Sequence, residues 1–517
     1  MYHGPLAWLL PGAVAGSFLS VSLSIVNRSQ LWIQKWALLG ACALSVASGT
    51  VSTLSAGERA VGSDWAGGDW ARFGGPTGDG KSTEIGISKS WGKEGPPLLW
   101  QMPVGEGYAA PSTANGRVFL FDRHEDTMRL TAIGARSGNE IWRSEYATDY
   151  EDMYGYSNGP RAVPVIDGDL LYTFGPGGRL RCHRVEDGSL VWEVDTASTF
   201  GVIQNFFGAG SAPVVEGNLL IAAVGGSPSD SPGIQSGKVV GNGSGIVAFD
   251  KRTGKVRYRI TDELASYSSP TIVTLGERRR GFWLSRSGLI GFDPATGKVD
   301  FHFPFHAKKL ESVNASNPVV VGDTVFITES YGPGSAVLRI RGEGYEVVRQ
   351  DDSPRDQSMS CHFMTPIYHQ GILYGSSGQG SAEAELRAVD YESGEILWRE
   401  PGLGRATLLY VEGHLVVFTE RGRLLLVEAT PERYNVVADA TPLLPILPES
   451  AADEIVTSSK STGEGRTEEH KGGEGTARQL LRYPAWSPPV LSHGILYLRG
   501  KGRLAAFELI PATDRSR

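Results

Sequence analysis

The chain has 517 residues, of which 40% are hydrophobic and 21% charged, proportions that are ordinary for a globular protein. Its formal net charge of −8 argues against a nucleic-acid-binding surface. The three cysteines, Cys42, Cys182 and Cys361, form no Cys-x-x-Cys pair, so a disulfide framework and a thiolate metal site are both poorly supported, and we predict no metal site.

Residues 1–56 are predicted to be a signal peptide or a membrane anchor. Residues 5–26 carry no charge and are mostly apolar, and Arg28 and Lys35 then precede a second apolar run, Trp36–Ala47. Basic residues before a short apolar run are typical of a secretory signal, whereas the first run is nearly long enough to span a membrane as a helix. Either alternative predicts export, with membrane contact only through this segment.

Residues 57–96 are predicted to be an extended N-terminal segment. Within it, Gly75–Ser82 satisfies the P-loop pattern Gly-x-x-x-x-Gly-Lys-Ser. A P-loop follows a buried strand and begins a helix, so that backbone N–H groups surround a phosphate. Asp69–Phe73 does not have the composition of a core strand, and Thr83–Ser90 lacks a helical apolar stripe. We therefore interpret the motif as a surface turn.

The rest of the chain repeats a β-hairpin that ends in an aromatic residue. In its clearest copy, Ala388–Trp398, two apolar runs flank a turn in which Asp390 can bond the backbone and Gly394 can take positive φ. Further copies are Ala132–Trp142, His183–Trp192, Ala248–Tyr258 and Gly291–Phe301. Repeats of about 40 to 60 residues are typical of propeller blades, and we expect each aromatic ring to pack between neighbouring blades.

A small residue and a proline begin another strand before each hairpin. The copies are Ala110-Pro111, Val163-Pro164, Ala212-Pro213, Ser269-Pro270, Asn317-Pro318, Thr365-Pro366 and Pro488-Pro489, and Ala406-Thr407 is aligned with them. This gives eight units of four strands, except that the last lacks its fourth strand. Residues 97–100 would supply it. The sequence thus predicts an all-β, eight-bladed propeller over residues 97–510, closed by residues 97–100 and followed by a tail at 511–517.

The pattern Asp-x-x-Ser/Thr-Gly-x-x-x-Trp, together with the proline strand start, resembles the PQQ-type (quinoprotein) propeller repeat. Over about residues 65–510 the chain resembles exported bacterial PQQ-like propellers similar to the propeller lipoprotein of the outer-membrane β-barrel assembly machinery. The stretches that carry this likeness are Trp70–Ser82, Gly95–Ser112, Tyr154–Pro164, Ser266–Pro270, Gly288–Gly297 and Trp398–Tyr434. The resemblance implies a fold and an exported location, periplasmic or membrane-anchored and facing the periplasm. It implies no activity.

PQQ dehydrogenases, as a family, have a disulfide between adjacent cysteines over the quinone, a Glu/Asn set for calcium and an aspartate base. This sequence has no adjacent cysteines and no Cys-x-x-Cys-His haem motif, and the acidic loop Asp149–Asp152 has nothing that would fix it against a cofactor. We therefore predict no catalytic residue and no cofactor. A PQQ-dependent oxidoreductase that binds PQQ and Ca²⁺ through atypical ligands is the alternative.

Function on a propeller concentrates in the long connections between blades. The residue three positions before each strand-starting proline should face the mouth of the central funnel. Gly210 and Ala315 fill this slot in two units. The candidate binding ring consists of the bulkier residues in the other slots: Tyr108, Arg161, Tyr267, Phe363 and Trp486. These side chains either bind a flat ring, a peptide or a polymer, or only fill the axis.

Two insertions, near residues 225–245 and 442–480, are rich in Gly and Ser or in charge and are predicted to be mobile. The second is either a docking segment or a neutral insertion. Taken together, the sequence favours a monomeric, non-catalytic binding scaffold of the cell envelope. Its expected partner is a protein or a polymer that contacts the loop face.

Overall fold

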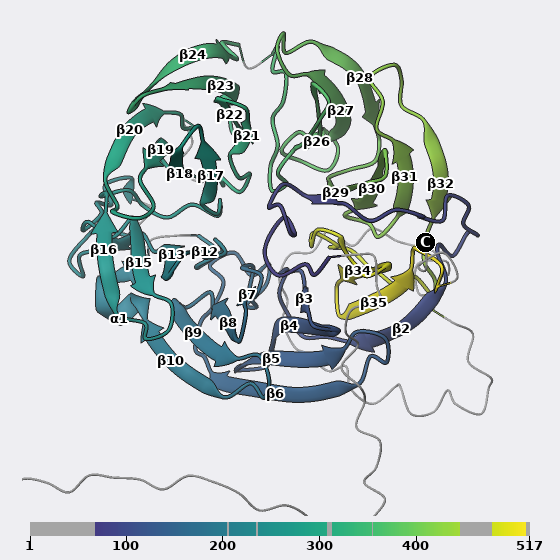
Figure 1. The fold of residues 1–517 in the computed structure, drawn as a ribbon, viewed down its shortest axis with the longest axis horizontal. Helices are drawn as coiled ribbons and strands as arrows, with labels where there is room; N and C mark the ends of the chain where they lie inside the picture. The colour runs from purple at the N-terminus through teal and green to yellow at the C-terminus, as the bar shows by residue number, and fades with distance from the viewer. Residues whose placement is uncertain are drawn as a thin grey trace, which may run out of the picture. The chain divides into compact units, whose positions relative to one another are not determined.

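A computed structural model describes residues 68–203, 206–233, 236–307, 313–353, 355–444 and 478–512. The predicted signal or anchor segment, the tail from residue 513 and residues 445–477 of the second insertion lie outside these ranges. Within them, eight blades of four antiparallel strands stand in a ring (Figure 1), and a short parallel strand is added to one of them, which confirms the predicted fold. One short helix, α1 (Thr196–Phe200), is present, and no helix in this part of the chain is long and apolar enough to cross a bilayer.

The blades follow one another along the chain, and each runs from the axis outward. The first four blades are β3 (Ser112–Ala114), β4 (Arg117–His124), β5 (Thr127–Gly134) and β6 (Glu140–Ala147); β7 (Val165–Asp167), β8 (Leu170–Phe174), β9 (Arg179–Arg184) and β10 (Leu190–Asp195); β12 (Val214–Glu216), β13 (Leu219–Ala223), β15 (Ile246–Asp250) and β16 (Val256–Ile260); and β17 (Thr271–Leu275), β18 (Arg278–Leu284), β19 (Gly288–Phe292) and β20 (Val299–Pro304).

The second half of the ring repeats this arrangement. Blades five to eight are β21 (Val319–Val321), β22 (Thr324–Glu329), β23 (Gly334–Arg341) and β24 (Gly344–Gln350); β25 (Ile367–His369), β26 (Ile372–Ser377), β27 (Glu385–Asp390) and β28 (Ile396–Pro401); β29 (Ala406–Val411), β30 (His414–Thr419), β31 (Leu424–Glu428) and β32 (Val436–Ala440); and β33 (Val490–Ser492), β34 (Ile495–Gly500), β35 (Arg503–Glu508) and β2 (Leu98–Pro103).

The ring closes as predicted, through a strand from the beginning of the propeller. β2 pairs antiparallel with β35, and Met102 lies opposite Leu504. The strand is longer than the predicted residues 97–100, since its ladder continues to Pro103. Because this blade takes its outermost strand from the beginning of the propeller, it has four strands like the other blades, and the two ends of the propeller are joined through β2 and β35.

The aromatic residue of the outermost strand joins neighbouring blades, as expected. Trp100 donates its indole N–H to the carbonyl of Ala135 in the first blade at 2.9 Å, and Trp142 does the same to Val185 in the second at 3.1 Å. Each ring also covers the turn glycine of the next blade. A Cβ placed on Gly138 would lie 2.9 Å from the Trp100 ring. This close approach explains why the turn requires glycine.

Residues 68–96, here called the strap, run from the middle of the ring to its rim before the chain enters β2 (Figure 1). The strap bonds to the first blade through Trp70 N–H and Thr113 Oγ1 at 2.8 Å. It bonds to the seventh through β1 (Lys81–Ser82), which pairs in parallel with β29. The P-loop-like motif forms turns that lead into β1, and residues 83–90 contain no helix, so the context that phosphate binding requires is missing.

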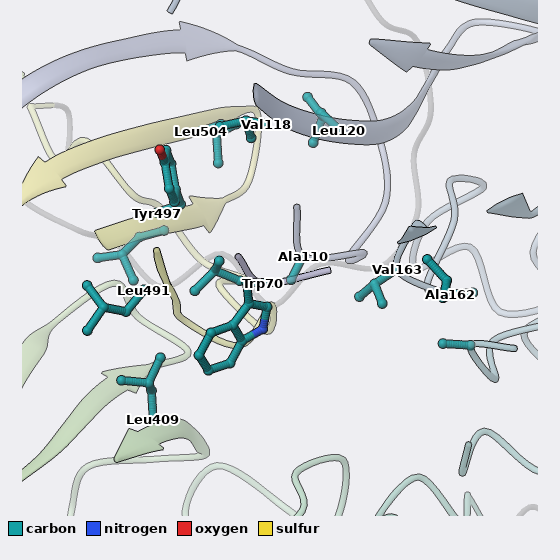
Figure 2. Packing of buried hydrophobic residues seen from close by; sticks show 14 of the residues in the cluster. Trp70, Ala110, Val118, Leu120, Ala162, Val163, Leu409, Leu491, Tyr497 and Leu504 are labelled. Carbon is teal, nitrogen blue, oxygen red and sulfur yellow. The ribbon is translucent and has the colours of Figure 1, made fainter. Parts of the chain in front are cut away.

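Trp70 anchors the strap in the largest hydrophobic core. Trp70 is 5% exposed and belongs to the same cluster as Leu409, Leu491, Ala110 and Val163, which lie in or just before the inner strands of four different blades (Figure 2). Burial of an indole ring removes roughly 150–250 Å² from water. The strap therefore holds blades from both ends of the propeller together.

The predicted insertion at residues 225–245 is partly ordered into a small sheet. Within it, β14 (Gly226–Ser227) pairs antiparallel with β11 (Val202–Ile203). These two strands come from the connection before the third blade and from the interior of that blade. They extend the blade on the side of its long connections.

Candidate functional site

The seven funnel residues predicted from the proline slots all line one cavity of about 300 Å³. They are Tyr108, Arg161, Gly210, Tyr267, Ala315, Phe363 and Trp486. They come together because the inner strands of successive blades start at the same level. The structure therefore brings all five members of the candidate binding ring around the axis, where the eight blades converge.

The eighth slot is filled by Arg405, which the sequence alignment missed. In β29, Val411 pairs with His414 across the turn, and the residue three positions before Val411 is Leu408. The same count reaches the strand-starting proline in most other blades, so Leu408 stands in place of the proline. The predicted alignment through Thr407 was thus one residue off, and Arg405 lies in the cavity wall.

Half of the ring is a continuous arc of stacked side chains. The guanidinium carbon of Arg405 lies 4.9 Å from the centre of the Trp486 ring, whose centre is 4.9 Å from that of Tyr108. The guanidinium of Arg161 follows, 5.7 Å from the Tyr108 ring. A guanidinium cation over the face of an aromatic ring is attracted electrostatically to the ring, so these contacts stabilise the wall. This arc is contributed by the seventh, eighth, first and second blades.

The other half of the ring alternates small and aromatic residues, and Phe363 closes it at the sixth blade. Gly210 and Ala315 occupy the slots of the third and fifth blades, and Tyr267 lies between them. The Tyr267 hydroxyl accepts the backbone N–H of Phe207 at 2.7 Å, which fixes the tyrosine against the wall. Gly210 and Ala315 are thus the two slots at which no large side chain narrows the cavity.

Arg161 is neutralised by a buried carboxylate behind the wall. Its Nη2 lies 2.5 Å from Oδ2 of Asp152, whose side chain is fully buried. Its Nη1 donates to the carbonyl of Phe207 at 3.0 Å, and the guanidinium lies 5.2 Å from the Phe207 ring. Arg161 thus ties two connecting loops together, and its charge is already compensated within the protein.

Arg405 is paired in the same way with Glu420. Nε and Nη2 of Arg405 lie 2.9 and 2.8 Å from the same oxygen, Oε2, of this buried carboxylate. Trp486 donates its indole N–H to Glu420 at 3.1 Å, and the Ser381 hydroxyl donates as well. Burial alone raises the pKa of Glu420, but the hydrogen bond from Ser381 and the charge of Arg405 outweigh it and hold the pKa below its usual value.

His362 completes this network as a neutral side chain. Arg405 can only donate, so Nδ1 of His362 accepts from Nη1 of Arg405 at 3.3 Å, and the ring proton resides on Nε2. Nε2 then donates to the Tyr331 hydroxyl at 3.0 Å. Burial lowers the pKa of His362 to about 4, and the Arg405 cation adds to this effect. The imidazole therefore adds no charge at neutral pH.

Several lining residues come from connections rather than from the repeat, and the slot rule did not find them. Tyr156, Phe207 and Tyr331 lie on loops of the face that carries the blade connections, and Tyr483 precedes the last blade. An excess of aromatic residues in these long connections was the available signal. Phe73 reaches the cavity from the strap, and no feature of the repeat predicted it.

The residues present do not fit calcium-bound PQQ. The described residues that line the cavity include no carboxylate, whereas Ca²⁺ takes six to eight oxygen ligands. Cys182 and Cys361 are free, buried thiols in separate parts of the ring, so the described chain forms no adjacent-cysteine disulfide. Its His, Cys, Asp and Glu side chains nowhere gather in a group of three or more that would hold a metal.

Solved structures match this chain at low sequence identity. BamB from Moraxella catarrhalis is 12% identical, covers 79% of this chain and 97% of its own, and has a TM-score of 0.47. Quinohemoprotein alcohol dehydrogenase from Comamonas testosteroni is also 12% identical, covers 85% of this chain and 80% of its own, and has a TM-score of 0.56. At such identity the likeness to the dehydrogenase shows the fold alone.

Comparison with curated protein sequences gives no match. The sequence profile described as outer membrane protein assembly factor BamB matches residues 87–229 and 232–432, well over half of the chain. The matched ranges begin in the strap and end in the seventh blade. The chain therefore belongs to the BamB family of PQQ-like β-propellers.

Proposed function

We propose that the protein is a non-catalytic binding propeller of the cell envelope that engages a protein partner through its loop face. The loop face is the one that carries the blade connections and the mouth of the cavity. The observation that carries this proposal is a connected aromatic surface there. Tyr154, Phe207, Tyr156, Trp486 and Tyr483 follow one another with ring centres 5.5 to 6.2 Å apart.

This surface has the properties of a contact site. Tyr156 is 61% exposed and Tyr483 49%, and Met153 and Tyr154 beside them are exposed as well. Exposed apolar residues that gather on one face favour an interaction surface, whereas scattered ones do not. Tyrosine, tryptophan and arginine are the residues that most often dominate binding energy at interfaces. The loops carry them on a rigid ring, so little ordering is needed on binding.

The family supports the nature of the partner and the location. Its description names outer membrane protein assembly, which favours a partner protein of that machinery over a soluble metabolite. A polymer of the envelope is the other occupant that the aromatic face suits. The protein then acts as an exported monomer, periplasmic or held at a membrane by its N-terminal segment.

Site-specific crosslinking tests this function. A photoreactive benzoylphenylalanine at Tyr156 in the full chain should crosslink to envelope proteins of the assembly machinery. The same residue at Ile141, which is 44% exposed on the outer strand β6, is the control. Crosslinks to an assembly protein from position 156 alone support the proposal. Equal yields from both positions, or none from Tyr156, contradict it.

The alternative is a quinone-dependent oxidoreductase with atypical ligands. The observation in its favour is that the aromatic walls of the cavity suit a planar ring. The absence of lining carboxylates among the described residues weighs against calcium. Titration with PQQ and Ca²⁺ decides the matter: saturable one-to-one binding with dye-linked alcohol oxidation supports this alternative, and no binding rejects it.

A further inference from the structure

We propose that the axial cavity binds the side chain of a tyrosine that the partner inserts from the loop face. This inference rests on the proposed function, because it names what the partner contributes to that same site. Three features carry it: the charge of the wall, the floor made by the strap, and the amide donor of Asn317 in the lining.

The charge of the wall favours a neutral occupant. Arg161 and Arg405 are the two cations that line the cavity in the described structure, and each is paired with a buried carboxylate. An anionic ligand would have to compete with Asp152 and Glu420 for these guanidinium groups. A cationic ligand would find no lining carboxylate among the described residues. A neutral ring meets neither penalty.

The floor shows that the axis already accommodates a phenyl ring, which a turn of the strap carries. Phe73 of the strap lines the cavity, and it also lines a smaller pocket on the side of Trp70 and Pro489. It lies between the two spaces together with Phe363 and Pro488, which also line both. A second aromatic side chain that enters from the loop face would meet Phe73 at the bottom and Tyr108 and Tyr267 at the sides. Ring pairs at such contacts contribute beyond their burial.

Asn317 supplies the selectivity. Its Oδ1 accepts the backbone N–H of Ser269 at 2.7 Å, which assigns the two ends of the amide because a backbone N–H can only donate. Asn317 lines the cavity beside Ala315, and its side-chain hydrogen bonds within the described residues use Oδ1, which leaves the Nδ2 donors for an occupant of the cavity. A phenol oxygen can accept from them, whereas phenylalanine leaves them unpaired. Tyrosine is therefore the aromatic residue that satisfies both the ring and the donor.

The first test uses amino-acid amides with the full chain. N-acetyl-tyrosinamide should bind about fivefold tighter than N-acetyl-phenylalaninamide, because the phenol gains one hydrogen bond. N-acetyl-leucinamide should bind more weakly than both. Isothermal titration measures all three. Equal affinity for tyrosine and phenylalanine amides, or tighter binding of an anion such as PQQ, overturns the inference.

A cavity-filling variant ties the binding to this site. Ala315→Leu should weaken N-acetyl-tyrosinamide binding about tenfold or more, because the larger side chain narrows the cavity. Ala295→Leu, on an exposed turn of the fourth blade outside the cavity lining, is the matched control and should bind like the unmodified chain. Equal binding by both variants overturns the inference. The comparison among the three amides holds even if Ala315→Leu fails to fold.

Crosslinking separates this inference from the proposed function. If Ala315→Leu abolishes the crosslinks from position 156 and Ala295→Leu keeps them, the partner uses the cavity as proposed. If the crosslinks persist in Ala315→Leu, the inference is wrong while the proposed function stands. If the unmodified chain gives no crosslinks to an assembly protein, the proposed function fails, whatever the amides do.

Discussion

Removal of the charge of Glu420 should destabilise the cavity wall far more than removal of a matched surface charge. Glu420→Gln keeps the shape of the side chain but leaves the Arg405 guanidinium without its anion. It also replaces one carboxylate oxygen with an N–H₂ group. Arg405, Trp486 and Ser381 all donate to this carboxylate, so the new donor would face other donors. The substitution therefore replaces a satisfied buried pair with an unpaired cation and crowded donors.

The size of the effect follows from burial. The Glu420 side chain is fully buried and that of Arg405 is 14% exposed. Loss of one partner of a buried pair costs about 3–5 kcal/mol, and the remaining exposure of Arg405 favours the lower end, about 3 kcal/mol. The control is Asp439→Asn in the same blade. Asp439 bonds Arg423 at 2.6 Å, but the two side chains are 45% and 44% exposed, so its loss should cost less than about 1 kcal/mol.

Urea unfolding followed by tryptophan fluorescence measures both variants. The pKa of Glu420 lies below its unfolded value of about 4.3, so its contribution is fully present at neutral pH and is lost as the pH falls through the folded pKa. The difference between the unmodified chain and Glu420→Gln should therefore shrink below about pH 4. Equal shifts for the two variants at pH 7, or a Glu420→Gln difference that does not change with pH, would refute the reasoning.

Three further predictions concern buried groups elsewhere. Burial raises the pKa of Glu329 to about 7, so the folded protein favours the protonated carboxyl and loses stability as the pH rises through this value. Glu329→Gln should therefore unfold at a higher urea concentration than the unmodified chain at pH 8 but not at pH 4. Equal urea midpoints at pH 8 would contradict this. Gly138→Ala should lower the free energy of unfolding by more than about 2 kcal/mol, because the new Cβ meets the Trp100 ring. Gly168→Ala has a similar positive φ but open space around it, and should lower it by about 1 kcal/mol in the same urea assay. Equal losses would show that the ring contact is not the cause. Trp70→Ala should expose the strap to trypsin before the blades are cut, as mass spectrometry of the fragments would show, and unchanged cleavage would mean that Trp70 does not anchor it.

The fold was predictable because its units repeat the same physical requirements. In most of the hairpin copies the turn glycine lies under the aromatic ring of the preceding blade, as Gly138 lies under Trp100, so the two residues recur together. The units with both the proline strand start and the hairpin gave the length of the repeat. The last unit lacks a fourth strand, which led to the prediction that residues 97–100 supply it. The strap was harder to predict because its contacts are with many blades at once. Trp70 and Glu84 lie outside the repeated units. Their hydrogen-bond partners, Thr113 for Trp70 and His493 for Glu84, are distant in sequence and come close only in the folded ring.

The site was predictable only where the repeat controls it. The slot before each proline gave Tyr108 and Phe363 directly, since a rigid inner strand fixes where that residue points. Arg405 was not predicted because Leu408 stands in the position at which the other inner strands have the proline used for the alignment. Phe207 and Tyr156 escaped for a different reason. They lie on long connections, whose course depends on contacts such as that between Arg161 and Asp152, which no local pattern encodes.

The paired arginines distinguish shared architecture from shared chemistry. A propeller axis collects one side chain from every blade, so a ring of aromatic and basic residues follows from the fold whether or not a cofactor binds. Which ligands the ring of side chains can bind depends on the buried groups that pair with those side chains. Asp152 and Glu420 are buried behind Arg161 and Arg405, and together they convert two cations into flat, neutral wall elements. Under the inference proposed above, such a wall selects an occupant by its shape and by a hydrogen bond rather than by its charge.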